Sequence, residues 1–207
     1  MIKVALQLLE HELREYITAQ PNNPPDWGVM LFNIANLADN NAGNDANTNN
    51  KLLISLVNIE EESAYKNLPT TTKMTNGSVR YANAPVYLNL YILFACNFDQ
   101  QYENALRLLS DCLRFFQGKR VFNLSNTPGF IPPDESFPDV QDMHLIMDLY
   151  TMTFEQINHL WGSLGGRQVP FAMYKARLVK LTDRRTMGTG PVIEEIGIES
   201  RAPAPTP

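Results

Sequence analysis

The chain has 207 residues, of which 44% are hydrophobic and 19% are charged, and its formal net charge at pH 7 is −5. This length is sufficient for one domain, or for one domain and a tail, without disulfide or metal staples. The negative charge argues against nucleic acid as the main partner, because binding to phosphates requires basic surface. The low charged fraction also indicates that part of the surface contacts other proteins.

The sequence argues against secretion by a signal peptide and against a membrane span. Glu10, His11 and Glu12 interrupt the N-terminal apolar run too early for a signal peptide. No apolar run approaches the ~20 residues that a membrane-spanning helix needs. The two cysteines, Cys96 and Cys112, have neither metal-binding nor redox spacing, which indicates a reducing compartment. We therefore expect a soluble protein without a signal peptide.

The first part of the chain predicts one helix and two strands. Residues 2–17 carry an apolar stripe at helical spacing, and the prolines that follow end the helix. The apolar run 27–35 predicts a strand. Residues 36–50 are rich in Asn, Asp and Gly and predict a loop. Residues 51–60 predict a strand that is apolar on both faces.

The stretch 86–119 is expected to organise the fold as a buried strand followed by a helix. Residues 86–95 are apolar or aromatic at nearly every position, which is typical of a strand in the middle of a sheet. Asn89 is the one polar break and needs a hydrogen-bond partner. Gly118 stands where a left-handed cap would end the helix. Spacings of three and four predict that its buried face consists of Tyr102, Ala105, Leu106, Leu109, Cys112, Leu113 and Phe116.

The polar segment 67–84 has room for a loop or a hairpin, so the strands before and after it are expected to pair antiparallel. Residues 121–124 predict a short edge strand, and the proline-containing segment 126–139 an irregular connection. Residues 142–152 and 171–181 predict two further strands.

A last helix is expected to begin at a capping box formed by Thr153 and Gln156. Gly165 and Gly166 are expected to end it. Its predicted buried face consists of Phe154, Ile157, Leu160, Trp161 and Leu164.

These elements predict a single α/β (α+β) domain over residues 1–181, with a mixed β-sheet flanked by helices. Residues 182–207 are predicted to form a flexible, proline-containing C-terminal arm. This arm carries an isolated apolar patch, for which strand addition to a neighbouring sheet edge is the predicted role. The partner-binding residues predicted there are Val192, Ile193, Ile196 and Ile198.

No pattern in the sequence predicts a catalytic, cofactor-binding or metal-binding residue. His11, His144 and His159 have no other ligand type at metal-binding spacing, and we interpret them as structural. The segment 162–167, GSLGGR, lacks the residues of a nucleophile elbow or a phosphate loop and lies at the end of a helix. Residues 60–62 form an acidic cluster, which we interpret as a solvated strand end, with a cation site as the alternative.

Several stretches together resemble the tail-terminator or cap proteins of phage-tail-like contractile injection systems. They are ALQLLEHELREYI (5–17), NKLLISLVNIEEE (50–62), APVYLNLYILFA (84–95), YENALRLLSDCLRFFQGK (102–119), DLYTMTFEQINHLWGSLGG (148–166) and PFAMYKARLVKL (170–181). The resemblance covers about residues 1–181. It implies a structural protein without enzyme activity or cofactor.

The resemblance further implies a hexameric ring of identical subunits at the end of the tube and sheath that is distal to the baseplate. Such a ring stops polymerisation and fixes particle length, and its partners are its own copies and the tube and sheath subunits. It would assemble in the cytoplasm, in a particle that is either released or anchored in the cell. An adaptor or anchoring role in the same machine is one alternative. A small-molecule-binding or hydrolytic α/β domain is the other.

Overall fold

The structure is a computed structural model of the chain. It describes residues 1–37, 48–65, 71–73, 78–99, 101–132, 140, 143–181 and 186–191. The chain divides into two compact units, each described by itself below. The first unit comprises Met1–Lys66 and Val86–Leu181, and the second comprises Asn67–Pro85 and Thr182–Pro207.

The first unit is built on a six-stranded sheet with the order β1-β2-β5-β8-β7-β6. Strands β1 and β2 are parallel, and the other neighbouring strands are antiparallel, which confirms the predicted mixed sheet and the antiparallel pairing of β2 with β5. The strand bounds are β1 Gly28–Leu31, β2 Lys51–Glu61, β5 Val86–Asn97, β6 Val121–Phe122, β7 Leu145–Leu149 and β8 Phe171–Leu181.

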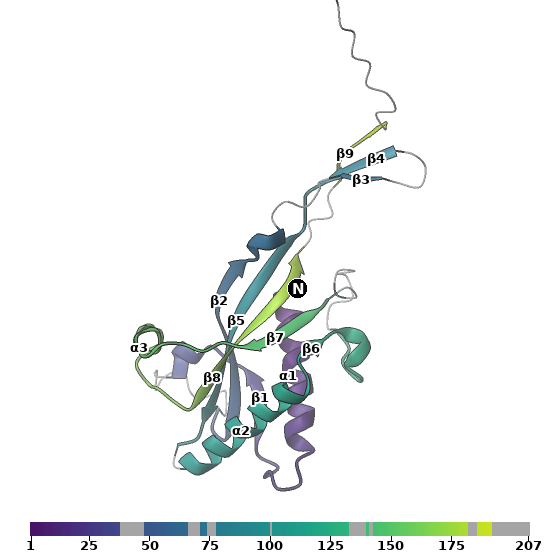
Figure 1. The fold of residues 1–207 in the computed structure, drawn as a ribbon. Helices are drawn as coiled ribbons and strands as arrows, with labels where there is room; N and C mark the ends of the chain where they lie inside the picture. Colours follow the sequence, from purple (N-terminus) through teal and green to yellow (C-terminus); the bar gives the residue numbers. More distant parts are fainter. Residues whose placement is uncertain are drawn as a thin grey trace, which may run out of the picture. The chain divides into compact units, whose positions relative to one another are not determined.

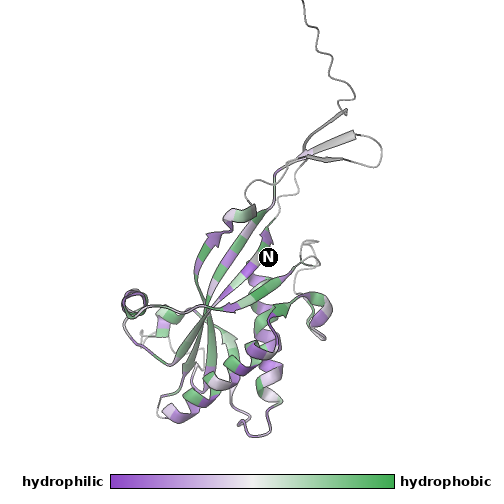
Figure 2. Ribbon diagram, in the orientation of Figure 1, coloured by the Kyte–Doolittle hydropathy of each residue, from purple (hydrophilic) through white to green (hydrophobic). Residues whose placement is uncertain are grey.

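Strand β5 lies in the interior of this sheet, and both of its faces are covered, as its apolar sequence predicts. Helices α1 (Ile2–Thr18) and α2 (Tyr102–Gly118) pack on one face. The 3-10 helix η1 (Ile34–Leu37) and helix α3 (Phe154–Ser163) pack on the other. Figure 1 shows these elements. Figure 2 shows hydrophobic residues along β5, and both hydrophobic and hydrophilic residues along α1 and α2.

Aromatic rings fill the centre of the face under α2. The ring of Phe94 on β5 is completely buried, and it lies 4.9 Å from Phe116 and 5.6 Å from Tyr174, measured between centroids. Phe116 lies in turn 4.5 Å from Tyr174 and 6.0 Å from Phe122. These side chains connect α2, β5, β6 and β8, so this cluster couples the helix to three strands of the sheet.

The polar break in β5 has a hydrogen-bond partner for its side-chain N–H group. Asn89 is 3% exposed, and its side-chain amide donates a hydrogen bond of 3.0 Å to Oε2 of Glu62. The pairing of β5 with β8 shifts register between Leu88 and Leu90, so Asn89 lies at a bulge. The hydrogen bond from Asn89 is the main reason that the pKa of Glu62 is lowered.

The predicted buried face of α2 was wrong in part. Tyr102 is 64% exposed, Leu106 43% and Leu113 37%, whereas Leu108 and Phe115 are buried. Apolar residues occupy a wide arc of this helix, so its sequence permits more than one rotation about the axis. The contact with α1 selects the observed one, since the ring of Phe115 packs 5.2 Å from that of Tyr16.

The predicted left-handed cap at Gly118 was also wrong. Gly118 is the last helical residue, and the chain leaves the helix at Lys119 in an extended conformation with φ −132°. Strand β6 begins two residues later, at Val121, so the backbone between helix and strand is already extended. At the end of α3, by contrast, Gly165 and Gly166 have φ of 92° and 77°, as predicted.

Three further boundaries differ from the prediction. The apolar run 27–35 is a strand only as far as Leu31, after which the chain turns into η1 and buries Ile34. The strand predicted at 142–152 is shorter, since β7 spans Leu145–Leu149. The capping box of α3 is confirmed, but Phe154, at its first helical position, is 90% exposed and does not belong to the buried face.

The second unit is a three-stranded antiparallel sheet with the order β3-β4-β9. Strands β3 (Thr71–Lys73) and β4 (Ser78–Ala82) form the hairpin for which segment 67–84 left room. Strand β9 (Thr186–Pro191) lies in the predicted arm 182–207 and was not predicted. Its sequence, TMGTGP, has two glycines and a proline, which are poor strand formers, so pairing with β4 is what makes it a strand.

We expect Phe94→Ala to lower the free energy of unfolding by about 3–5 kcal/mol, because it empties the centre of the aromatic cluster. Denaturant unfolding monitored by circular dichroism measures this change. Tyr102→Ala, at an exposed position, is the control and should change the free energy by no more than about 0.5 kcal/mol. Equal effects of the two substitutions would contradict the described core.

Candidate partner-binding surface

The titratable side chains of the described residues do not gather into a reactive centre. No group of three or more His, Cys, Asp and Glu residues within this part of the chain is placed to hold a metal ion. The side chain of His159 is 80% exposed, and its nearest carboxylate, Glu155, is 3.8 Å away. Cys96 and Cys112 are buried free thiols, and burial raises the pKa of each.

None of the helices in the described ranges is both long enough and apolar enough to cross a membrane.

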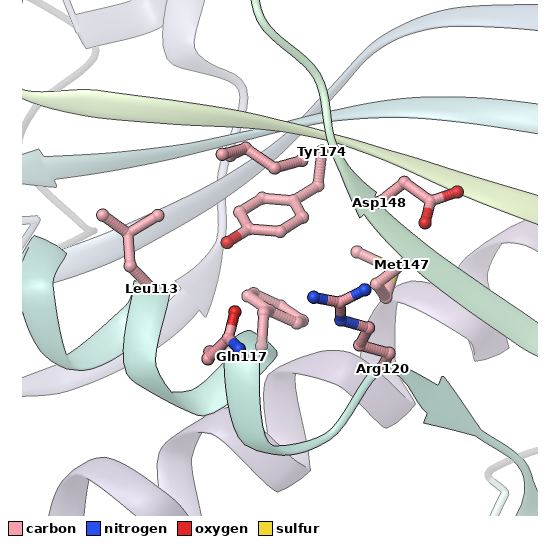
Figure 3. Close-up of a pocket in the computed structure, with 8 residues that line it drawn as sticks. Leu113, Gln117, Arg120, Met147, Asp148 and Tyr174 are labelled. Carbon is pink, nitrogen blue, oxygen red and sulfur yellow. The ribbon is translucent and has the colours of Figure 1, made fainter.

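A hollow of about 470 Å³ lies between the C-terminal half of α2 and strands β7 and β8 (Figure 3). Its floor is apolar and consists of Phe116, Met147 and Tyr174, which are all buried. Its rim carries Leu113 from α2 and Leu149 from β7, which are 37% and 58% exposed. Exposed leucines beside an apolar hollow are a feature of protein-binding surfaces.

The polar groups around this hollow are mostly hydrogen-bond donors. Arg120 and Gln117 line it, and the hydroxyl of Tyr174 points into it toward α2 (Figure 3). Burial raises the pKa of Tyr174, so this hydroxyl stays protonated and able to donate. The carboxylate of Asp148 is already bound by Nε of Arg177 at 2.6 Å. The hollow therefore suits a partner that brings acceptors and negative charge.

A second hollow, of about 380 Å³, lies on the opposite face of the sheet, over β5 and beside α3. There the hydroxyl of Tyr91 donates to Oε2 of Glu60 at 2.7 Å, and the ring of Tyr91 stands edge-on to that of Tyr150 at 5.0 Å. Burial, and then the hydrogen bond to Glu60, raise the pKa of Tyr91 to about 12. The carboxylate of Glu60 therefore accepts a hydrogen bond within the fold.

The residues predicted to bind a partner, Val192, Ile193, Ile196 and Ile198, lie outside the described residues. The hollow at α2 was not predicted from the sequence. Leu113 was predicted to be buried because it fits the helical spacing of α2. Its exposure depends on the rotation of α2 about its axis, which the spacing does not determine.

Comparison with solved structures identifies the class of fold. The sheath/tube terminator of PVC, an extracellular contractile injection system, in its extended state, superposes with a TM-score of 0.61 at 14% sequence identity. The match covers 99% of this chain and 64% of that one. The tube-terminating cap of the anti-feeding prophage superposes with a TM-score of 0.59 at 12% identity, over 97% of this chain and 61% of that one.

The fold is therefore that of terminator caps of contractile injection systems. Residues 5–195 match the model of the Pvc16 N-terminal domain, and the chain belongs to this family. The predicted resemblance to terminator and cap proteins is confirmed. The chain spans a little under two thirds of the length of these two structures. No curated protein sequence matches it significantly.

The bond between Tyr91 and Glu60 gives a pH-dependent prediction. The folded state raises the pKa of Tyr91 to about 12 from the ordinary 10.0, so its contribution to stability is complete below pH 10 and is lost between pH 10 and 12. Tyr91→Phe should lower the free energy of unfolding by about 1 kcal/mol at neutral pH. The difference from the wild type should shrink as the pH rises from 10 to 12, as measured by urea unfolding.

Tyr102→Phe is the matched control, since Tyr102 is 64% exposed. It should leave the free energy of unfolding within about 0.5 kcal/mol of the wild type at every pH. A constant difference between Tyr91→Phe and the wild type across this pH range would contradict the assigned pKa.

Proposed function

We propose that this chain is a structural terminator of a contractile injection particle, without catalytic activity. The observation that carries the proposal is the family match over residues 5–195. The superposition of nearly the whole chain on two terminator caps supports it. In this role the protein binds the last ring of tube or sheath subunits, stops polymerisation and thereby fixes particle length.

The proposed active form is a ring of six identical subunits at the end distal to the baseplate. A cyclic ring uses two different patches on each subunit, repeated around the axis. The exposed apolar residues Leu113, Leu149 and Phe154 suit such contacts. The ring assembles in the cytoplasm and becomes part of a particle that is released or anchored in the cell.

The mass of the purified protein tests the ring. Six subunits of 23.4 kDa give a particle of about 140 kDa, which multi-angle light scattering separates from a monomer or dimer. Negative-stain images of the same sample should show closed rings. A monomer at every concentration, and also at the end of assembled particles, would contradict the ring.

The position and effect of the protein in the particle test termination itself. Particles assembled without this chain should have an open distal end and a broad distribution of lengths. Adding back the chain should restore one length and place density at that end in electron micrographs. Two results together would favour the adaptor role and overturn the terminator role. They are a normal length of particles assembled without the protein, and density for the protein away from the distal end in particles assembled with it.

A further inference from the structure

Strand β7 has an open edge next to the hollow at α2. Strand β6 has only two residues and pairs with Leu145 and Ile146 of β7, so within the described residues no strand pairs with the rest of that edge. On the β8 side, the N–H of Tyr150 donates to the carbonyl of Met173 at 2.8 Å. On the other side, the N–H of Met147 donates to the carbonyl of Arg120 at 2.8 Å.

Backbone groups of an antiparallel strand alternate between its two sides. Since Met147 points its N–H away from β8 and Tyr150 points its N–H toward β8, Leu149 directs its N–H and C=O away from β8, beyond the end of β6. This pair is one residue of open edge, at which another strand can begin to pair beyond the end of β6. The structure thus supplies main-chain partners as well as an apolar hollow.

The side chains here select the kind of strand that fits. Leu149 and Leu113 form an exposed apolar rim over the floor of the hollow. Arg120 has no ion-pair partner within the described residues, and the hydroxyl of Tyr174 likewise has no hydrogen-bond partner there. The site therefore favours an extended segment that carries both aliphatic side chains and carboxylates.

The chain itself contains such a segment directly after β9. Residues 192–199, VIEEIGIE, have four aliphatic residues and three glutamates, with no lysine or arginine.

We propose that residues 192–198 of one copy add as a strand to the open edge of β7 in the next copy, with aliphatic side chains over the hollow. This rests on the proposed ring, because a ring places identical copies side by side. It assigns a receptor surface, formed by Leu113, Arg120, Leu149 and Tyr174, to a segment whose composition alone indicated binding.

Site-directed crosslinking of the full-length protein tests the pairing. One chain carries Leu149→Cys, and a second chain carries one introduced cysteine at a position from 192 to 198. A short thiol crosslinker is then added to each mixture. The native Cys96 and Cys112 are buried, so they do not compete. Because the cysteines are on different chains, every heterodimer linked through these positions joins two copies.

Strand addition predicts crosslinking with a period of two along the segment, since successive side chains point to opposite faces. One alternating set of positions should react several-fold faster than the other. Tyr102→Cys replaces Leu149→Cys in the control, because it is exposed and lies outside the hollow. This control should give neither comparable yield nor alternation.

Charge reversal tests the role of Arg120. Arg120→Glu should lower the crosslinking rate about tenfold, as expected for loss of a hydrogen bond to a charged group. Arg167→Glu reverses a charge that lies outside the hollow and pairs with Asp99, and it should leave the rate unchanged. Circular dichroism confirms that each variant is folded.

Equal reactivity at all seven positions, or an Arg120→Glu rate equal to that of the wild type, would overturn the inference. The mass of the wild-type protein is measured on the same preparations. A 140 kDa ring without the alternating crosslinks refutes the strand addition but leaves the terminator standing. Absence of the ring, of capping and of crosslinks refutes both.

Discussion

The fold depends on covering both faces of β5. A strand that is apolar on both sides is stable only with a layer on each, and the chain supplies α1 and α2 for one face and η1 and α3 for the other. The aromatic cluster of Phe94, Phe116 and Tyr174 fixes α2 in position on the sheet. The hollow between α2, β7 and β8 lies beside this cluster and shares Phe116 and Tyr174 with it.

The sequence predicted this central arrangement well, because a strand as continuously hydrophobic as β5 is stable only in the interior of a sheet that is covered on both faces. It also predicted the partner requirement of Asn89 and the capping box of α3, because each follows from local hydrogen bonding. The rotation of α2 could not be predicted, because Leu106 and Leu113 are as apolar as Leu108, and only the contact with α1 distinguishes them.

The hollow on the folded unit could not be predicted from the sequence, whereas the C-terminal apolar segment could be singled out and its role stays a prediction. Apolar residues in the C-terminal segment stood out because polar residues and prolines surround them. The surface on the folded unit did not, because an exposed leucine at the rim of a hollow has the same sequence pattern as a core leucine. Strand β9 escaped prediction for the opposite reason, since its glycines carry no hydrophobic pattern and its pairing with β4 bridges more than a hundred residues.

The two layers on the sheet differ greatly in how firmly they are held. Of the ten residues of α3, only Trp161 is fully buried, whereas six residues of α1 and six of α2 are. Helix α3 can therefore detach while the aromatic side of the sheet stays intact, as a partial unfolding with a smaller free energy than global unfolding. Amide protons of α3 should therefore exchange with solvent earlier than those of α2.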